Sequence, residues 1–303
     1  MKPLLKILVA LLAATAMTAS ANAQQLTGTL KKIKDTGSIV IGHRESSIPF
    51  SYYDDKQKVV GYAVDLCLSI VDAVKSHLKL KTLDVKYNPV TSATRIPLMA
   101  NGTIDLECGS TTNNLARQKQ VSFTITHFVT ATRFVSKKAA NLKTLNDLKG
   151  KTVVSTSGTT NIKLATELNV EKKLGMNIIA AKDHAEAFLT VQTGRAAAFF
   201  MDDILLYSLV ATSKNPKDFD ISNDALSVEP YGIMVRRDDP AFKKVVDAAL
   251  IKVYTSGEIN GIYEKWFLKP IPPKGVNLNV PMSAQFKRVV ANPTDSGKPE
   301  DYK

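Results

Sequence analysis

The sequence Glu107-Cys108-Gly109-Ser110-Thr111-Thr112-Asn113-Asn114-Leu115-Ala116-Arg117 connects a predicted strand to a predicted helix. The preceding Gly102-Thr-Ile-Asp-Leu106 indicates a turn and a short buried strand, and Asn113 or Asn114 is a candidate N-cap for the helix. Hydroxyl side chains fill the loop, and Arg117 adds a planar guanidinium suited to a carboxylate. Two interpretations fit this loop alone equally well: a binding site for a small anion, or an ordinary polar turn.

The residues before this loop repeat the order strand, loop, helix. We predict strands over 38–41 and 83–87 and helices over 64–78 and 95–100. This order is typical of a parallel sheet flanked by helices, in which ligands bind beyond the carboxyl ends of the strands. The side chains expected at those ends are Arg44, Ser92, Arg95, Ser110, Thr112 and Arg117.

A second assembly of the same kind follows, so the fold class is α/β with two lobes. Its predicted strands cover 151–154, 178–180 and 196–201, and its predicted helices cover 162–168 and 185–193. The strand-like stretches 129–135 and 231–235 connect the two assemblies, and paired crossovers of this kind make a hinge. We therefore predict lobe 1 over 24–131 and 228–290, and lobe 2 over 132–227.

The ends of the chain differ from the lobes in composition. Residues 1–23 combine two lysines, an apolar run and the ending Ala21-Asn22-Ala23, which predicts a secretory signal peptide and a periplasmic protein. The apolar run is too short to span a bilayer. Residues 291–303 are polar with Pro and Gly, so we expect a loose C-terminal tail.

The chain has 303 residues and a formal net charge of +12. No long Lys/Arg block and no basic stripe interleaved with aromatic residues occurs, so nucleic acid is not an expected partner. An exported location permits a disulfide between Cys67 and Cys108, but Cys67 falls on an apolar helical face and Cys108 near a strand end, so two buried free thiols fit equally well.

No catalytic or metal-binding motif appears in the sequence. The four histidines lack metal-ligand spacing, and no G-x-S-x-G, P-loop or dinucleotide fingerprint occurs, so no metal or cofactor is expected. Asp202 ends an apolar strand and could receive an ammonium group or cap a helix. Thr160 lies in a second hydroxyl loop, where capping is the simpler role. His184 follows a strand and could donate to a carboxylate or be a solvated loop residue.

Six stretches resemble the periplasmic solute-binding proteins for polar amino acids that serve ABC transporters, closest to the branch for glutamate and aspartate. They are IGHRESSIPFSYYD (41–54), TSATRIPLMANGTIDLECGSTTNNLARQ (91–118), VVSTSGTTN (153–161), AKDHAEAF (181–188), FMDD (200–203) and KWFLKPIPPK (265–274). The resemblance covers nearly the whole mature chain. It implies two lobes that close on L-glutamate or L-aspartate around a two-strand hinge and deliver it to a membrane permease.

The resemblance also implies a role for each candidate residue. Arg117, Thr112 and Thr160 would hold the α-carboxylate. Asp202, with Ser110, would hold the ammonium group. The side-chain carboxylate would be held by Arg44, Arg95, Ser92 and His184.

Other functions remain open at this point. One is an enzyme on the same fold, such as a periplasmic dehydratase of cyclic acids, which would need a general acid or base aimed at the substrate's carbon skeleton. Another is a binding protein for a different polar amino acid, and a third is a sensor that does not take part in transport. We expect a monomer that is not an enzyme.

Overall fold

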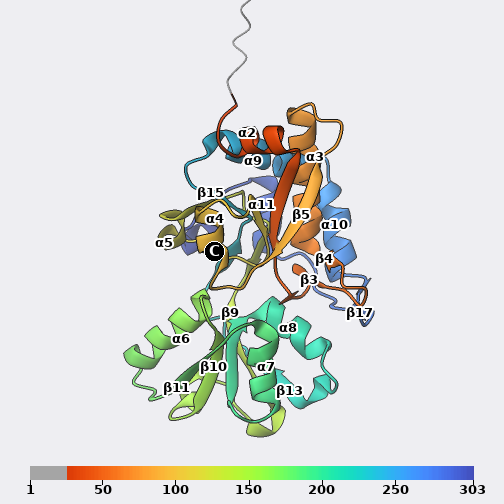
Figure 1. The fold of residues 1–303 in the computed structure, drawn as a ribbon. Helices are drawn as coiled ribbons and strands as arrows, with labels where there is room; N and C mark the ends of the chain where they lie inside the picture. Colours follow the sequence, from red (N-terminus) through yellow and green to blue (C-terminus); the bar gives the residue numbers. More distant parts are fainter. Residues whose placement is uncertain (1–25) are drawn as a thin grey trace, which may run out of the picture.

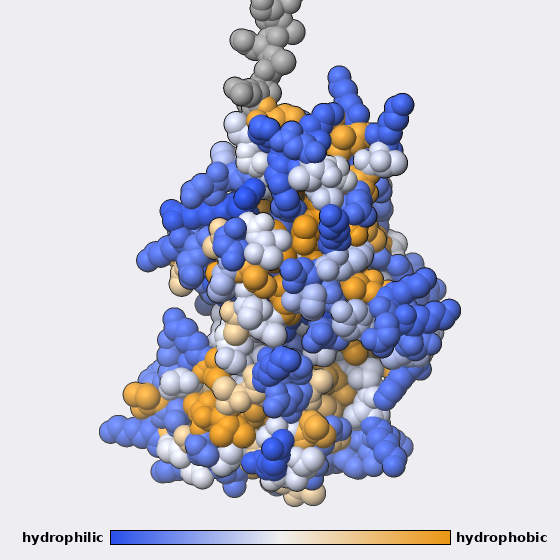
Figure 2. Space-filling model, in the orientation of Figure 1, coloured by the Kyte–Doolittle hydropathy of each residue, from blue (hydrophilic) through white to orange (hydrophobic). Residues whose placement is uncertain are grey.

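The computed structural model describes residues 26–303, and the predicted signal peptide lies outside the described residues. Two lobes lie one above the other, each built from a sheet with helices on its faces (Figure 1). No helix in residues 26–303 combines the length and the apolar character needed to cross a membrane. Hydrophilic side chains spread over both lobes on the face that Figure 2 shows.

The sheet of the first lobe confirms the predicted order of strands and helices. Its strands lie in the order β5 (Asp84–Pro89), β1 (Ser38–His43), β6 (Leu106–Cys108), β15 (Met234–Arg236) and β7 (Val121–Phe123). β1 pairs in parallel with β5 and β6, whereas β15 runs antiparallel to β6 and β7. β15 is reached only after the chain has formed the second lobe, so the first lobe is discontinuous in sequence.

Helices pack around this sheet, and the longer ones bury an apolar face. The helices are α2 (Gly28–Thr36), α3 (Tyr62–His77), α4 (Arg95–Ala100), α5 (Leu115–Gln118), α9 (Pro240–Thr255), α10 (Glu258–Phe267) and α11 (Ala284–Ala291). The residues of α3 that repeat at three and four positions, including Cys67, Ile70 and Val74, are all buried. The short strands β2 (Ser46–Ser47), β3 (Ser51–Tyr53) and β4 (Val59–Val60) form a small separate sheet.

The second lobe repeats the arrangement. Its strand order is β11 (Asn177–Ala181), β10 (Thr152–Thr156), β12 (Ala198–Asp202), β9 (Thr132–Lys137) and β13 (Phe219–Ile221). Its helices are α6 (Thr160–Glu171), α7 (His184–Gln192) and α8 (Asp203–Ala211). The parallel trio β11, β10 and β12 carries loops at its carboxyl ends that face the first lobe (Figure 1).

Two antiparallel strands connect the lobes. β8 (Phe128–Thr130) pairs with β14 (Glu229–Tyr231), in the register Phe128 with Tyr231. Each crossover was predicted as one continuous strand and is in fact two, because β9 and β15 begin separately after a one- or two-residue break. Paired extended segments with a break on each side suit a hinge, because few residues need to change their dihedral angles.

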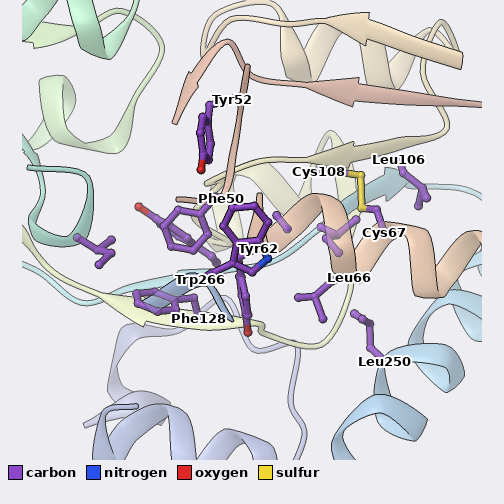
Figure 3. Packing of buried hydrophobic residues seen from close by; sticks show 14 of the residues in the cluster. Phe50, Tyr52, Tyr62, Leu66, Cys67, Leu106, Cys108, Phe128, Leu250 and Trp266 are labelled. Carbon is purple, nitrogen blue, oxygen red and sulfur yellow. A yellow bond between two sulfur atoms is a disulfide. The ribbon is translucent and has the colours of Figure 1, made fainter. Parts of the chain in front are cut away.

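An aromatic cluster fills the core beneath this hinge (Figure 3). Phe128 stacks on Phe267 with ring centroids 5.1 Å apart, and Phe50 contacts Tyr62 edge to face at 5.9 Å. Tyr62 also donates a hydrogen bond of 2.8 Å to the carbonyl of His127. The hinge strand β8 is therefore anchored firmly to the first lobe.

The C-terminal residues correct one prediction. The segment 291–303, expected to be loose, ends in a short 3-10 helix (Pro299–Tyr302), and Tyr302 is buried. Its hydroxyl lies 2.7 Å from Thr126 Oγ1, and the backbone N–H of Thr126 donates to the carbonyl of Thr294 at 2.8 Å. Polar composition misled the prediction, because buried hydrogen bonds rather than apolar contacts hold much of this segment.

Candidate functional site

A small, partly open cavity of about 10 Å³, room for about one water molecule, lies between the two lobes. It is lined by Ser92, Arg95, Ser110, Thr112, Thr159, Thr160, Asn161, His184, Met201, Asp202 and Leu205. The first lobe contributes the loop after β6 and the start of α4, and the second lobe contributes the starts of α6 and α7 and the end of β12. Strand ends and helix starts therefore meet here, as the parallel-sheet rule predicts.

Seven of the nine predicted site residues line this cavity. They are Ser92, Arg95, Ser110, Thr112, Thr160, His184 and Asp202. Arg44 and Arg117 are outside the lining set. Both still interact with the charge of Arg95, which lines the cavity. Burial lowers the pKa of Arg44 and of Arg117 most, and the positive charge of Arg95 lowers each further.

Arg44 and Arg95 form a buried cationic pair, each only 2% exposed. Arg95 Nη1 donates to the carbonyl of Ser110 at 3.2 Å and also to Thr111 Oγ1. Burial lowers the pKa of Arg44 to about 10, and the pKa of Arg95 is lowered for the same reason. With a pKa of about 10, the guanidinium of Arg44 is still charged at neutral pH. Within residues 26–303, Arg44 Nη1 and Arg95 Nε have no hydrogen-bond partner.

Glu107 partly balances this positive charge. Its Oε2 accepts a hydrogen bond of 2.6 Å from Thr111, the residue that also accepts from Arg95. Gly109 lies between Glu107 and Arg44, where a Cβ would come within 2.4 Å of Glu107 Oε1 and 2.9 Å of Arg44 Cγ. Glycine is therefore needed at this position for Glu107 and Arg44 to lie so close together.

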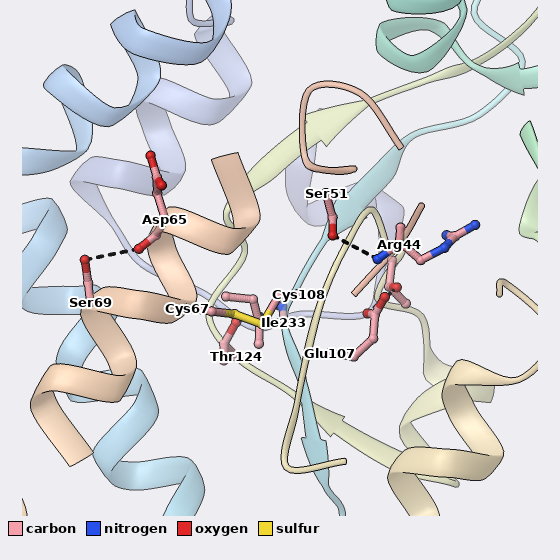
Figure 4. The surroundings of a disulfide bond; sticks show 10 residues. Arg44, Ser51, Asp65, Cys67, Ser69, Glu107, Cys108, Thr124 and Ile233 are labelled. Atoms are coloured by element: carbon pink, nitrogen blue, oxygen red, sulfur yellow. Dashed lines mark hydrogen bonds between the residues drawn. A yellow bond between two sulfur atoms is a disulfide. The ribbon is translucent and has the colours of Figure 1, made fainter. Parts of the chain in front are cut away.

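A disulfide lies directly beneath this group (Figure 4). Cys108 at the end of β6 is bonded to Cys67 in α3, which settles the question that the sequence left open. Both cysteines are fully buried. The bond fixes the helix α3 to the strand that leads into the Ser110–Arg117 loop.

Arg117 connects the two lobes. Its Nη1 donates to the carbonyl of Thr112 at 2.8 Å, and its Nη2 donates across the junction to the carbonyl of Gly158 at 3.2 Å. Asn114 is the N-cap of α5, because its side chain accepts from the backbone N–H of Arg117 at 2.9 Å. Burial lowers the pKa of Arg117 to about 9, which still leaves it charged at neutral pH.

Two threonines face each other across the junction. Thr112 Oγ1 and Thr160 Oγ1 are 3.5 Å apart, and Thr160 also donates to Glu229 Oε2 at 2.9 Å. Thr159, not Thr160, caps α6 by accepting from the backbone N–H of Ile162. The capping role that the sequence suggested for Thr160 therefore belongs to Thr159, and the hydroxyl of Thr160 is directed toward Glu229 and Thr112.

Asp202 occupies the N-cap position of α8, yet its side chain does not cap that helix. Its Oδ1 accepts from Asn161 Nδ2 at 2.7 Å, and its Oδ2 accepts from the hydroxyl of Tyr231. Burial raises the pKa of Asp202 to about 7, and the negative charge of Glu229 raises it further, against the two hydrogen bonds that lower it. This carboxylate is thus directed into the interior and is only partly ionised at neutral pH.

Three neutral side chains complete the cavity wall. Ser92 Oγ, Ser110 Oγ and His184 Nε2 are buried and make no hydrogen bond within the described part of the chain. Burial lowers the pKa of His184 well below its usual value, and the charges of Arg44 and Arg95 lower it further. Its Nδ1 lies 2.8 Å from Thr156 Oγ1. When Nδ1 accepts from that hydroxyl, Nε2 carries the hydrogen and can donate.

Sequence reasoning missed four polar residues of the site: Glu107, Asn161, Glu229 and Tyr231. Glu107 and Asn161 lie inside motifs that the sequence singled out, so their positions offered a signal. Glu229 and Tyr231 carried none, because they reach the site only through the pairing of β14 with β8.

On one side, the site offers hydrogen-bond donors that can bind a carboxylate of a ligand. On the other side, it offers the carboxylate of Asp202, which can accept hydrogen bonds from a ligand. Buried polar groups without partners are costly, so their clustering indicates a place for a polar ligand. In residues 26–303, no group of three or more His, Cys, Asp or Glu side chains is placed to hold a metal ion.

Residues 39–269 match the model of the bacterial extracellular solute-binding proteins, family 3. The chain is 56% identical over 283 residues to the L-glutamate/L-aspartate-binding protein of Pseudomonas aeruginosa, covering 93% of this chain and 94% of that protein. It is 49% identical over 294 residues to the glutamate/aspartate import solute-binding protein of Escherichia coli, with 97% of each chain covered.

A solved structure supports the same assignment at the level of the fold. An ancestral arginine-binding protein bound to arginine superposes with a TM-score of 0.69 at 29% identity, covering 76% of this chain and 98% of that one. The family model spans most of both lobes and includes all nine candidate site residues. This chain belongs to the bacterial extracellular solute-binding proteins of family 3.

Proposed function

We propose that this protein captures L-glutamate or L-aspartate between its lobes in the periplasm and delivers it to a membrane ABC permease, without catalysing a reaction. The observation that carries the proposal is the placement of charge around one small cavity between the lobes. Buried Arg95 lines it on the first-lobe side, with buried Arg44 close enough for their charges to interact, and the buried carboxylate of Asp202 lines it on the second-lobe side. The names of the two bacterial relatives agree with this ligand class.

Arg44 and Arg95, with Ser92 and His184, would bind the side-chain carboxylate of the ligand. A carboxylate removed from water needs several charge-assisted donors, and here Arg44 Nη1, Arg95 Nε, Ser92 Oγ and His184 Nε2 have no partner in residues 26–303. A neutral amide in place of that carboxylate would leave the two buried cations only partly balanced, by Glu107, which disfavours glutamine.

The backbone groups of the ligand would bind along the junction. Arg117, Thr112 and Thr160 would hold the α-carboxylate, because the hydroxyls of the two threonines are close enough for one carboxylate to reach both. Asp202, with Ser110, would hold the ammonium group. The contacts of Arg117 and Thr160 with the opposite lobe or the hinge would then couple binding to closure.

Calorimetric titration of refolded, ligand-stripped mature protein tests this proposal. L-glutamate, L-aspartate, L-glutamine and L-arginine would be compared, and one-to-one binding of the two acidic amino acids alone is the expected result. Binding of none of the four, or a preference for glutamine or arginine, would overturn it. Chromatography of the ligand after incubation should return it unchanged, whereas turnover would support the enzyme alternative.

A further inference from the structure

The chain continues well beyond the part that matches the family model. That match ends at residue 269, and the remaining residues form β16 (Pro270–Ile271), β17 (Val276–Asn277), α11 and the final 3-10 helix. This extension returns along the first lobe, where residues 295–298 lie next to α5. We call residues 292–303 the C-terminal strap.

The strap contacts the Ser110–Arg117 loop through a buried asparagine. Asn113 is 1% exposed, and its Nδ2 donates to the carbonyl of Asp295 at 2.8 Å. Gln118 Nε2 donates to the same carbonyl at 3.1 Å and to Asn113 Oδ1 at 2.9 Å. Gly297 packs so closely that a Cβ there would lie 2.9 Å from the carbonyl carbon of Asn114.

The other contacts of the strap lie next to the hinge. Tyr302 Oη lies 2.7 Å from Thr126 Oγ1 and donates to the carbonyl of Ser296 at 2.7 Å. The backbone N–H of Thr126 donates to the carbonyl of Thr294 at 2.8 Å. Only His127 separates Thr126 from the first residue of the hinge strand β8, so the strap joins the ligand loop to the base of the hinge.

Two kinds of contact hold the loop around Asn113. The first is backbone pairing with the second crossover, because the N–H of Asn113 donates to the carbonyl of Pro230 at 2.7 Å and the N–H of Gly232 donates to the carbonyl of Thr111 at 3.0 Å. Thr112, which precedes it, lines the cavity and accepts from Arg117 Nη1, and Asn114, which follows it, caps α5. α5 has only four residues, too few to be stable as an isolated helix. The second kind of contact is the side chain of Asn113, which joins the loop to the strap through the carbonyls of Asp295 and Ser296.

We infer that the C-terminal strap, acting through Asn113, holds the ligand loop in its binding geometry and so raises ligand affinity without touching the ligand. Asn113 is thus a positioning residue. For the identity of the ligand, this inference rests on the function proposed above. A loop that occupied its binding geometry only about one tenth of the time would lower affinity about tenfold.

The variant Asn113→Ala, measured by calorimetry with L-glutamate, tests the inference. Asn169→Ala is the matched control, because Asn169 is a half-buried asparagine of the second lobe whose side chain bonds both backbone groups of Met176. Each substitution removes a similar set of hydrogen bonds. Asn113→Ala should weaken binding about tenfold, whereas Asn169→Ala should leave affinity unchanged even if it lowers the melting temperature to the same extent.

A second measurement needs no ligand. Amide hydrogen exchange of residues 110–118 should be faster in Asn113→Ala, in Asn113→Asp and in a chain ending at Ala291 than in the unaltered protein. Unchanged exchange, or faster exchange with unchanged affinity, would overturn the inference. If the unaltered protein bound neither acidic amino acid, the proposed function would fail, and the exchange data alone would still decide whether the strap orders the loop.

Discussion

The hydroxyl of Tyr231 donates a hydrogen bond to Asp202 Oδ2 and thereby joins the last residue of β12 to the hinge strand β14. The other carboxylate oxygen accepts from Asn161. Both donors are neutral, and no ion pair to Asp202 occurs among residues 26–303. Burial without a cationic partner is why the pKa of Asp202 is raised to about 7.

This raised pKa predicts that affinity for L-glutamate falls as the pH is lowered. Only the ionised form of Asp202 can pair with the ligand's ammonium group, so below pH 7 binding must first release a proton from this carboxyl. Well below that pKa, affinity should drop about tenfold for each unit of pH. Titrations between pH 5 and 8, repeated in buffers of different ionisation enthalpy, would measure both the fall and the proton release.

The variant Asp202→Asn provides the control for this prediction. It should bind weakly, with little dependence on pH, because no proton is exchanged at position 202. In the free protein, the raised pKa means that the folded state holds this proton more tightly than the unfolded chain. The contribution of Asp202 to stability is therefore lost as the pH rises from about 4 to about 7. An affinity that stayed flat across this range would show that Asp202 does not bind the ammonium group.

The buried pair Arg44 and Arg95 predicts how the protein distinguishes L-glutamate from L-glutamine. Arg44→Ala and Arg95→Ala should each weaken L-glutamate binding by about 2–5 kcal/mol, the cost of leaving a buried charge without its partner. Binding of L-glutamine should change by only about 1 kcal/mol, the value of a neutral hydrogen bond. Calorimetry with both ligands gives the comparison.

Arg195→Ala is a suitable control for the arginine variants, because Arg195 is exposed and follows the C-terminal end of α7, whereas the cavity is lined by His184 at the start of that helix. It should leave both affinities unchanged. Equal losses for glutamate and glutamine in the Arg44 and Arg95 variants would mean that these arginines do not recognise the side chain of the ligand.

The parts of the fold that sequence predicted well are those set by local pattern. The apolar spacing in α3 and the asparagine before α5 depend on neighbours in sequence, and both were predicted correctly. The same reasoning placed Asp202 at a strand end but left its role open. Only the structure shows that its side chain turns away from the helix it precedes.

The features that sequence did not predict depend on distant pairing. Glu229 enters the site because β14 pairs with β8, about a hundred residues earlier in the chain. Tyr302 is buried through a hydrogen bond to Thr126, at a still greater separation. A polar segment with Pro and Gly gives no local signal for such contacts, so the C-terminal strap was expected to be loose.

The disulfide predicts a stability that depends on reductant. Cys67 and Cys108 are 41 residues apart, and closing a loop of that length in the unfolded chain stabilises the folded state by about 4 kcal/mol in the chain-entropy treatment. A Cys67→Ala/Cys108→Ala variant should therefore unfold at lower urea concentration than the oxidised protein. Adding dithiothreitol should lower the midpoint of the unaltered protein and leave the variant unaffected. Identical midpoints for all four samples would show that the bond contributes nothing to stability.

Gly158 lies at a close contact between the two lobes, and we predict that tight ligand binding requires this contact. Its φ is +75°, and a Cβ there would lie 2.7 Å from Ala93 Cα and 2.8 Å from the carbonyl of Ser92 in the opposite lobe. Gly158→Ala should therefore hinder closure and weaken L-glutamate binding.

Gly150→Ala is the matched control, because Gly150 has a φ of +71° and no atom within 4 Å of the added methyl group. Both variants carry the backbone cost of about 1–2 kcal/mol for a left-handed residue. Only Gly158→Ala should also lose affinity and show a larger radius of gyration with glutamate by small-angle scattering. Equal affinities for the two variants would show that closure does not require this contact.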